Sequence, residues 1–293
     1  MSTQRPFLQS AFWKAGLFPI IRLILALLFV AVPIAAIQAL VKSLGAMPYS
    51  DIVFTCFAVP VAFLAYWGYV RLVERRPVAE LSLVGAPKEF GIGLLFGAGL
   101  FTMVIGILWT AGYYHVTGSN GWIVLIESIG LAVLSGFIEE LIARGIIFRI
   151  IEESLGTWNA LALSAIMFGS MHLGNPHATV ESATAIALEA GLLLGGCYIL
   201  TRRLWLAVGL HLAWNFTQGG IFGVAVSGTT PYGILRSTLS GPEILSGGPF
   251  GAEASVFAVI VCVSGFFFII INAKKRGQIV RPFWRRPAVG QTA

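Results

Sequence analysis

Long, nearly uninterrupted runs of apolar residues divide the chain, and they restrict its fold more than any other feature. They lie near 20–41, 52–71, 91–113, 122–148, 158–173, 183–201, 204–226 and 254–272. A helix needs about 20 apolar residues to cross the hydrocarbon core of a bilayer. Only helices and closed barrels satisfy their backbone in lipid, and barrel strands alternate apolar with polar residues, which these runs do not. The sequence therefore predicts an all-α, polytopic transmembrane helix bundle with about eight spans.

The composition excludes a water-soluble domain. Only 11% of the residues are charged, whereas a soluble domain carries about 25%. The formal charge of +6 does not indicate a nucleic-acid partner, because the basic residues lie between the apolar runs and in the tail. Each of the three cysteines, Cys56, Cys197 and Cys262, lies inside an apolar run and is expected to be a small buried residue outside any disulfide.

The basic residues also predict how the chain is oriented. With eight spans both termini share one side of the membrane, and sixteen Lys and Arg residues then lie on that side against two, Lys42 and Arg236, on the other. The sixteen are Arg5, Lys14, Arg22, Arg71, Arg75, Arg76, Lys88, Arg149, Arg202, Arg203, Lys274, Lys275, Arg276, Arg281, Arg285 and Arg286. The positive-inside rule makes this side cytoplasmic. We expect an integral protein of a bacterial inner membrane with both termini in the cytoplasm.

Three segments follow from this plan. Residues 1–120 hold the first three spans, 121–226 form a helical core, which contains the motif residues described below, and 227–293 hold an outside loop, the last span and a basic tail.

A charged cluster, Glu139-Glu140-Leu-Ile-Ala-Arg144, interrupts the fourth apolar run. Ionisable groups inside a membrane are expensive, so each is a candidate functional group. Glu140 and Arg144 are four residues apart and share a helix face, which suits an ion pair and leaves Glu139 freer. The alternative is a cytoplasmic helix end with a solvated Glu–Arg pair, but the residues on both sides of the cluster are apolar.

Two further polar groups occur in later runs. His172 ends the fifth run, and taken alone it is most simply a capping or core histidine. His211 and Asn215 are four residues apart on one face of the seventh run, where their simplest role is to hydrogen-bond between helices. Together with Glu139, however, they supply what a hydrolase needs. Glu139 can act as base, His172 can orient the water, and His211 and Asn215 can donate to an oxyanion.

The order and spacing of these residues resemble a known motif set. Glu139-Glu140-x-x-x-Arg144, Phe168-x-x-x-His172 and His211-x-x-x-Asn215 are similar to the motifs of the CPBP family, the CAAX-protease and bacteriocin-processing intramembrane endopeptidases. Gly191-Leu-Leu-Leu-Gly195 and Thr201-Arg-Arg-Leu-Trp205 also resemble that family's linker between its later motifs. The resemblance covers about residues 131–217.

The resemblance implies Glu139, His172, His211 and Asn215 as catalytic residues and Glu140 and Arg144 as supporting ones. It favours no cofactor but allows zinc, which Glu139, His172 and His211 would then bind, since two His and one Glu form a known catalytic zinc set. The expected partners are a peptide or protein substrate and the lipid bilayer. Glu189 departs from the pattern, as an acid where an apolar residue is expected; it either lines the cavity or pairs with a basic group.

Other membrane proteases fit less well. The chain has a single aspartate, Asp51, whereas aspartyl intramembrane proteases need two, and it has no His-Glu-x-x-His motif. The competing function is a non-catalytic membrane protein, such as a proton-coupled transporter or a bacteriocin self-immunity scaffold, although no inverted repeat supports a transporter. The peptidase hypothesis requires Glu139, His172 and His211 to line one cavity, and we expect this cavity to open to the cytoplasm or laterally to lipid.

Overall fold

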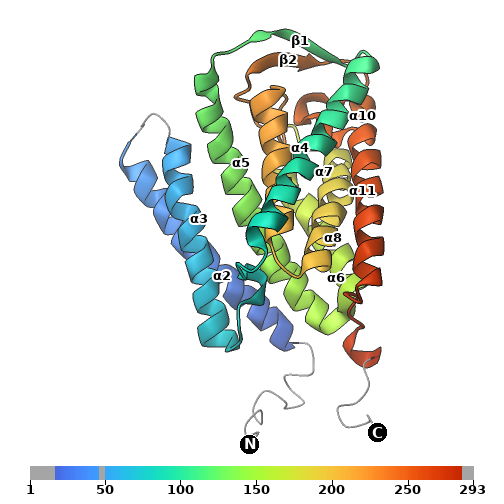
Figure 1. Cartoon of the computed structure of the whole chain (residues 1–293). Helices are drawn as coiled ribbons and strands as arrows, with labels where there is room; N and C mark the ends of the chain where they lie inside the picture. Colours follow the sequence, from blue (N-terminus) through green and yellow to red (C-terminus); the bar gives the residue numbers. More distant parts are fainter. Residues whose placement is uncertain (1–16, 46–49, 286–293) are drawn as a thin grey trace, which may run out of the picture.

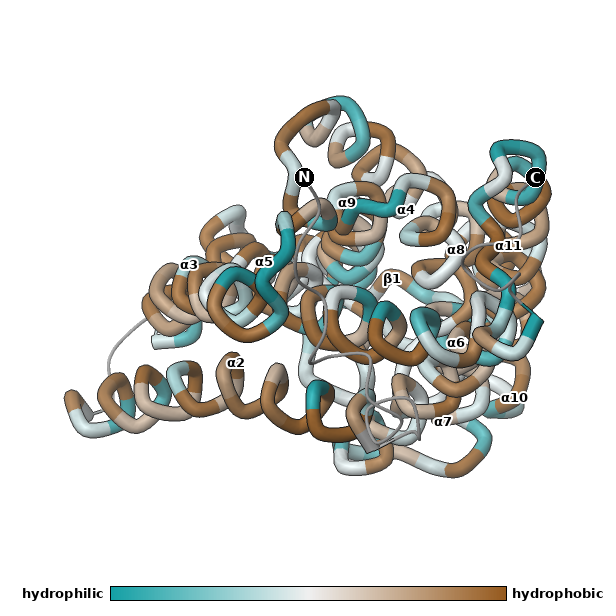
Figure 2. The backbone as a smooth tube through the Cα atoms, turned by 90° about the horizontal axis from the view of Figure 1, so that it is seen from below, coloured by the Kyte–Doolittle hydropathy of each residue, from teal (hydrophilic) through white to brown (hydrophobic). Residues whose placement is uncertain are grey.

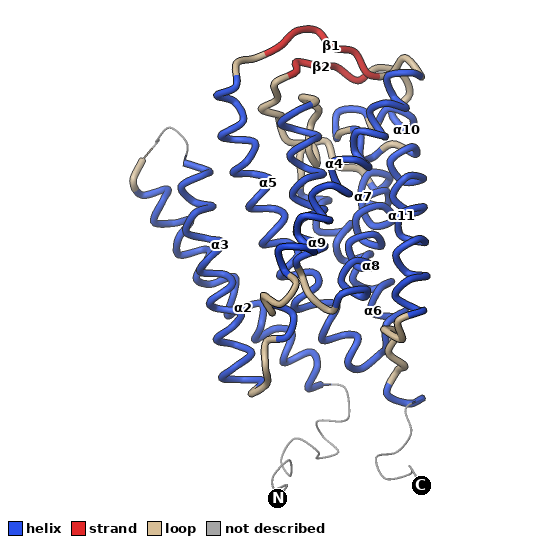
Figure 3. The backbone as a smooth tube through the Cα atoms, in the orientation of Figure 1, coloured by secondary structure: helices blue, strands red, loops and turns tan. Residues whose placement is uncertain are grey.

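The computed structural model describes residues 17–45 and 50–285, so Arg5, Lys14 and Arg286 lie outside the described residues. The α-helices are α2 (Leu17–Ser43), α3 (Ser50–Tyr69), α4 (Ala86–Thr110), α5 (Leu125–Glu140), α6 (Arg149–Met171), α7 (Val180–Ile186), α8 (Leu192–Thr201), α9 (Trp205–Asn215), α10 (Glu243–Ser246) and α11 (Val256–Lys275). Four π-helical segments continue neighbouring helices: η1 (Val70–Glu74), η4 (Leu141–Phe148), η6 (Ala187–Gly191) and η7 (Phe216–Ile221). An antiparallel ribbon of β1 (Tyr114–Ser119) and β2 (Leu235–Leu239) lies across one end of the bundle, opposite the first residues of α2 and the last residues of α11 (Figures 1 and 3).

The predicted all-α polytopic bundle is confirmed. Six helices of the described chain are long and apolar enough to cross a membrane: Phe18–Ser43, Ser50–Glu74, Ala86–Thr110, Trp122–Gly174, Val180–Thr201 and Val256–Lys275. The fourth contains two of the predicted spans, while α9 with η7 is too short to meet the same criterion. Hydrophobic residues cover much of the outside, including most of α2 (Figure 2). The chain is an integral membrane protein.

A glycine divides the fourth of these helices. Gly156 has φ 77° and ψ 169°, which breaks the helix, and a side chain there would collide with the backbone near Pro282. The chain descends through α5 and η4, reverses at Gly156, and rises along the remainder of α6 to His172. The rising part packs against α7 and α8, with Gly169 beside Ala183 and Gly191 beside Ala165.

Close backbone contacts hold α9 in the centre of the bundle. A Cβ atom at Gly93 or Gly97 of α4 would collide with the backbone of Leu206 or Leu210, and one at Gly209 would collide with Phe90. On another side, a Cβ atom at Gly136 of α5 would lie 3.0 Å from Leu212. Small residues let transmembrane helices approach closely in this way. They bring the fourth and seventh apolar runs together.

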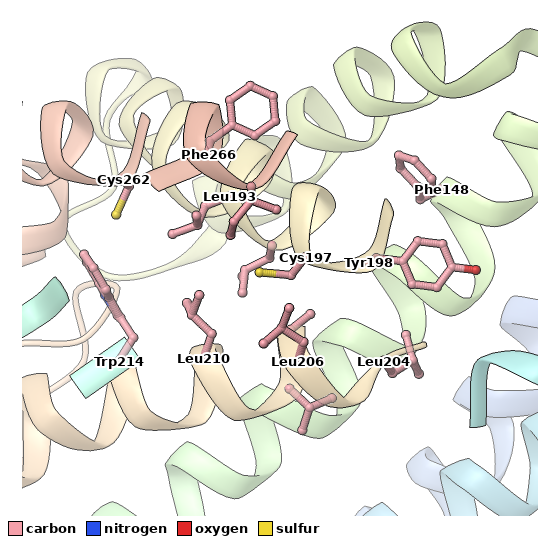
Figure 4. Packing of buried hydrophobic residues seen from close by; sticks show 14 of the residues in the cluster. Phe148, Leu193, Cys197, Tyr198, Leu204, Leu206, Leu210, Trp214, Cys262 and Phe266 are labelled. Carbon is pink, nitrogen blue, oxygen red and sulfur yellow. The ribbon is translucent and has the colours of Figure 1, made fainter. Parts of the chain in front are cut away.

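A dry core fills the space between α8, α9 and α11. It includes Leu193 and Cys197 of α8, Leu210 and Trp214 of α9, and Phe266 of α11 (Figure 4). Cys197 and Cys262 are buried as expected. The expectation was wrong for Cys56, which is exposed on α3 because that face of the helix has no protein neighbour.

Charged residues tie the helices together at the end where both termini lie. Glu74 accepts from Arg22 at 2.6 Å, from Arg149 at 2.9 Å and from Arg76 at 2.7 Å, which joins α2, η1 and α6. Arg203 pairs with Glu89 nearby. We call this group of residues the basic end of the bundle.

Candidate active site

Glu140 and Arg144 form a buried ion pair at the junction of α5 and η4. Neither side chain is more than 2% exposed, and Arg144 Nη1 lies 2.8 Å from Glu140 Oε1. Arg144 Nη2 also donates to the carbonyl oxygens of Ala190 at 3.0 Å and Gly191 at 3.2 Å. The guanidinium lies over the ring of Phe168, 4.6 Å from its centroid. The pairing expected from the four-residue spacing is therefore present.

Glu140 makes a second contact that the spacing did not indicate. The same oxygen, Oε1, lies 2.9 Å from Nδ1 of His211 on α9. A carboxylate only accepts, so Nδ1 carries the hydrogen and Nε2 points away from Glu140. Glu140 thus fixes the orientation of the His211 ring.

Glu139 lies on the neighbouring face of α5, and its carboxylate points toward His172 and His211. Its side chain is 32% exposed, and its Oε2 lies 3.9 Å from His172 Nε2 and 4.0 Å from His211 Nε2. No protein group in the described chain donates to this buried oxygen. A buried carboxylate oxygen without a donor is costly, so it needs water or substrate.

His172 is held by its own helix. Its Nδ1 lies 2.8 Å from the carbonyl oxygen of Phe168, which can only accept, so Nδ1 donates and Nε2 faces Glu139. His172 is the first residue after α6. Two imidazoles from different helices therefore present Nε2 to the same carboxylate.

Asn215 lies one helical turn beyond His211. Its Nδ2 donates to Ser135 Oγ of α5 at 2.8 Å, which fixes the amide. The second hydrogen of the same nitrogen is available to a ligand.

These side chains line one cavity of about 460 Å³. Its lining includes Glu139, His172, His211 and Asn215, with apolar walls from α5 and further residues from α2, α3 and the loop 226–232. The structure thus brings all four predicted catalytic residues together. His172 reaches this cavity because the rising part of α6 ends close to His211 of α9, with Glu139 between the two rings.

Two more acids lie behind the histidines. Glu189 lines a second, much smaller cavity with His172, His211 and Glu253, so the unexpected acid faces a cavity. Glu253 precedes α11 and accepts from the backbone N–H of Ser227. Burial raises the pKa of Glu253 to about 7. Sequence reasoning missed Glu253, because it lies in a loop with no matching motif.

The donor set does not fit a tetrahedral zinc ion as it stands. Zinc bonds of 2.0–2.2 Å to nitrogen and oxygen require donor atoms about 3.4 Å apart, whereas Glu139 Oε2 is 3.9 and 4.0 Å from the two Nε2 atoms. Across residues 17–45 and 50–285, no group of three His, Cys, Asp or Glu side chains has a metal-holding arrangement.

Comparisons with known proteins agree with the motifs. Residues 120–217 match the model of the type II CAAX prenyl endopeptidase Rce1-like family. The chain is 24% identical over 169 residues to "Putative membrane peptidase YdiL" of Bacillus subtilis (strain 168), which covers 53% of this chain and 67% of that protein. No solved structure matches the chain. The matched residues contain every motif on which the resemblance was based, so this part of the chain is similar to the Rce1-like family.

Proposed function

We propose that the chain is an intramembrane endopeptidase in which Glu139 activates the attacking water. The observation that carries the proposal is the placement of Glu139 Oε2 about 4 Å from two imidazole nitrogens inside a cavity large enough for a peptide. A general base acts through direct hydrogen bonds or one intervening water. One water between Glu139 and the two rings is compatible with both distances.

The hydrogen-bond partners define the roles of the two histidines. With Nδ1–H donated to Phe168, neutral His172 has a lone pair on Nε2. This lone pair accepts a hydrogen bond from the water, while Glu139 removes the water's other hydrogen as a proton. The water oxygen then attacks the peptide carbonyl carbon. Glu139 later passes its proton to the departing amine, which balances the hydrolysis.

His211 and Asn215 stabilise the negative oxygen that forms on the carbonyl. As an imidazolium, His211 donates from Nε2 while Glu140 holds Nδ1–H, and Asn215 adds its free N–H. Charge balance supports this protonation state. Glu139 and Glu140 bring two negative charges and Arg144 one positive charge, so a charged His211 makes the group neutral. Fixed donors in a dry site contribute strongly to such catalysis.

Glu139→Gln tests the proposal directly. It keeps the shape of the side chain but removes the base, so the purified variant should fold normally and lose cleavage of a quenched fluorescent peptide library. The matched control is Glu127→Gln on the same helix, outside the residues that line the cavity. Full activity in Glu139→Gln would overturn the proposed mechanism.

The mechanism uses no metal, which gives a second test. Prolonged dialysis against a strong chelator should leave cleavage unchanged. Loss of activity that added zinc restores would contradict a glutamate-type mechanism while leaving the peptidase assignment in place.

A further inference from the structure

We propose that the cavity receives its peptide from the end of the bundle that carries the β1–β2 ribbon, which faces away from the cytoplasm. The substrate is then an extended peptide segment outside the cytoplasm or in the outer half of the bilayer. This inference rests on the proposed peptidase function and adds the side from which the substrate arrives. It departs from the expectation, drawn from the sequence, that the cavity opens to the cytoplasm.

The cavity has its mouth at the ribbon end. Its wall there is the loop 226–232, in which Thr229, Thr230 and Tyr232 are exposed. The carbonyl of Tyr232 accepts from Ser128 in the first turns of α5. The carbonyl oxygen of Gly233, the next residue in the chain, accepts from Nδ2 of Asn120 at 2.8 Å, and Asn120 directly follows β1. From this mouth the cavity descends along α5 to Glu139.

On the side toward the basic end, packed side chains close the cavity. Below Glu139 lie Glu140 and Arg144, both buried, and beyond them the Glu74–Arg149 pair of the basic end. Among the described residues that line the large cavity, none comes from η4 or from the charged group at the basic end. A peptide arriving from the basic end would have to break these ion pairs to reach the water.

His172 itself lies close to the aqueous phase on the ribbon side. After a single 3-10 turn, residues 175–179 are irregular and mostly exposed, and they include Asn175, Pro176 and His177. Asn175 lines the cavity beside His172. Irregular backbone is not stable against lipid, so this loop lies at or beyond the membrane surface.

The walls indicate what kind of peptide fits. Leu131 and Leu134 of α5 and Phe54 of α3 make an apolar lining, and Gln38 of α2 and Thr230 add polar groups toward the mouth. An extended peptide with apolar side chains matches this lining.

The basic residues determine which compartment the mouth faces. In the described chain, Lys42 at the end of α2 and Arg236 in β2 lie toward the ribbon. The remaining described Lys and Arg residues outside η4 belong to the start of α2, η1 and the chain to α4, the start of α4, the start of α6, the turn between α8 and α9, and the chain from the end of α11, which lie toward the opposite end of the bundle (Figure 1). Cytoplasmic loops carry the excess of Lys and Arg. The termini are then cytoplasmic and the mouth faces the opposite compartment.

Thiol labelling tests the side of access. In a Cys56→Ser background, where the remaining Cys197 and Cys262 are buried, Thr230→Cys places a thiol at the mouth. Val84→Cys is the matched control, because Val84 is 79% exposed at the basic end. A membrane-impermeant maleimide added to spheroplasts should label Thr230→Cys and should reach Val84→Cys only after permeabilisation. Labelling of Val84→Cys before permeabilisation, or none of Thr230→Cys, overturns the proposal.

Activity provides the second measurement. A bulky maleimide on Thr230→Cys should lower cleavage at least tenfold, whereas the same reagent on permeabilised Val84→Cys should leave it within twofold. Unchanged cleavage by labelled Thr230→Cys would refute access through this mouth. Labelling is read independently of proteolysis, so an active Glu139→Gln variant refutes the peptidase mechanism alone, and a reversed labelling pattern refutes the access side alone.

Discussion

Replacing Glu140 with Gln tests the contact that links the ion pair to the proposed active site. Its buried Oε1 accepts from Arg144 at 2.8 Å and from His211 at 2.9 Å. Gln keeps the shape but brings no negative charge to either donor. Removing one partner of a buried ion pair costs about 3–5 kcal/mol. Because Arg144 keeps two other acceptors, the carbonyls of Ala190 and Gly191, we expect the lower end of that range, about 3 kcal/mol.

Thermal unfolding in detergent measures this loss. At about 2–4 °C per kcal/mol, Glu140→Gln should lower the Tm by about 6–12 °C, and Glu139→Gln should lower it far less, since Glu139 Oε2 has no protein donor to lose. The double variant Glu140→Gln/Arg144→Met should regain part of the stability, because it removes both charges. If Glu140→Gln unfolds at the wild-type temperature and Glu139→Gln does not, the assignment of structural and catalytic carboxylates is reversed.

Two further predictions concern helix packing and pH. Gly97→Ala should lower stability by about 1–3 kcal/mol, because its Cβ atom would collide with Leu210, whereas Gly99→Ala on the same helix meets nothing within 4 Å and should be neutral by thermal unfolding. Burial raises the pKa of Glu253 from 4.5 to about 7, and Glu189 and His211 line the same small cavity. The folded state therefore holds a proton that the unfolded state releases, so stability should fall as pH rises from about 4.5 to about 7 and level off above that. Tm measured across this range should fall less in Glu253→Gln; an equal fall would contradict the assignment.

The sequence was sufficient for the helices but not for the way the loops pair. Apolar runs located the spans, and the polar stretch around Arg149 and Gly156 correctly separated the fourth from the fifth. The β1–β2 ribbon was not predicted, because it joins segments 114–119 and 235–239 that are distant in sequence and have no strong strand pattern. The segment 227–253 was expected only to be an outside loop, yet its first residues line the cavity.

The sequence likewise predicted some contacts of the candidate site and not others. Four-residue spacing predicted the Glu140–Arg144 pair and placed His211 and Asn215 on one face, because these relations are local to one helix. The bond between Glu140 and His211 depends on how closely α5 approaches α9, which Gly136 permits. Only the packed bundle shows that the supporting acid orients a histidine on another helix.

The rising part of α6 is shorter than the hydrocarbon core of a typical bilayer is thick. From Thr157 to Met171 it is about 22 Å long at 1.5 Å per residue, whereas the hydrocarbon core of a typical bilayer is about 30 Å thick. Its outer face is apolar and exposed, with Ile166 60% and Met171 53% exposed, so lipid tails lie against it. The acyl chains beside α6 must therefore compress, at fractions of a kcal/mol per Å of mismatch. The bilayer should therefore be locally thinner beside α6, and membranes of short-chain lipids should accommodate the protein at the lowest free energy of mismatch.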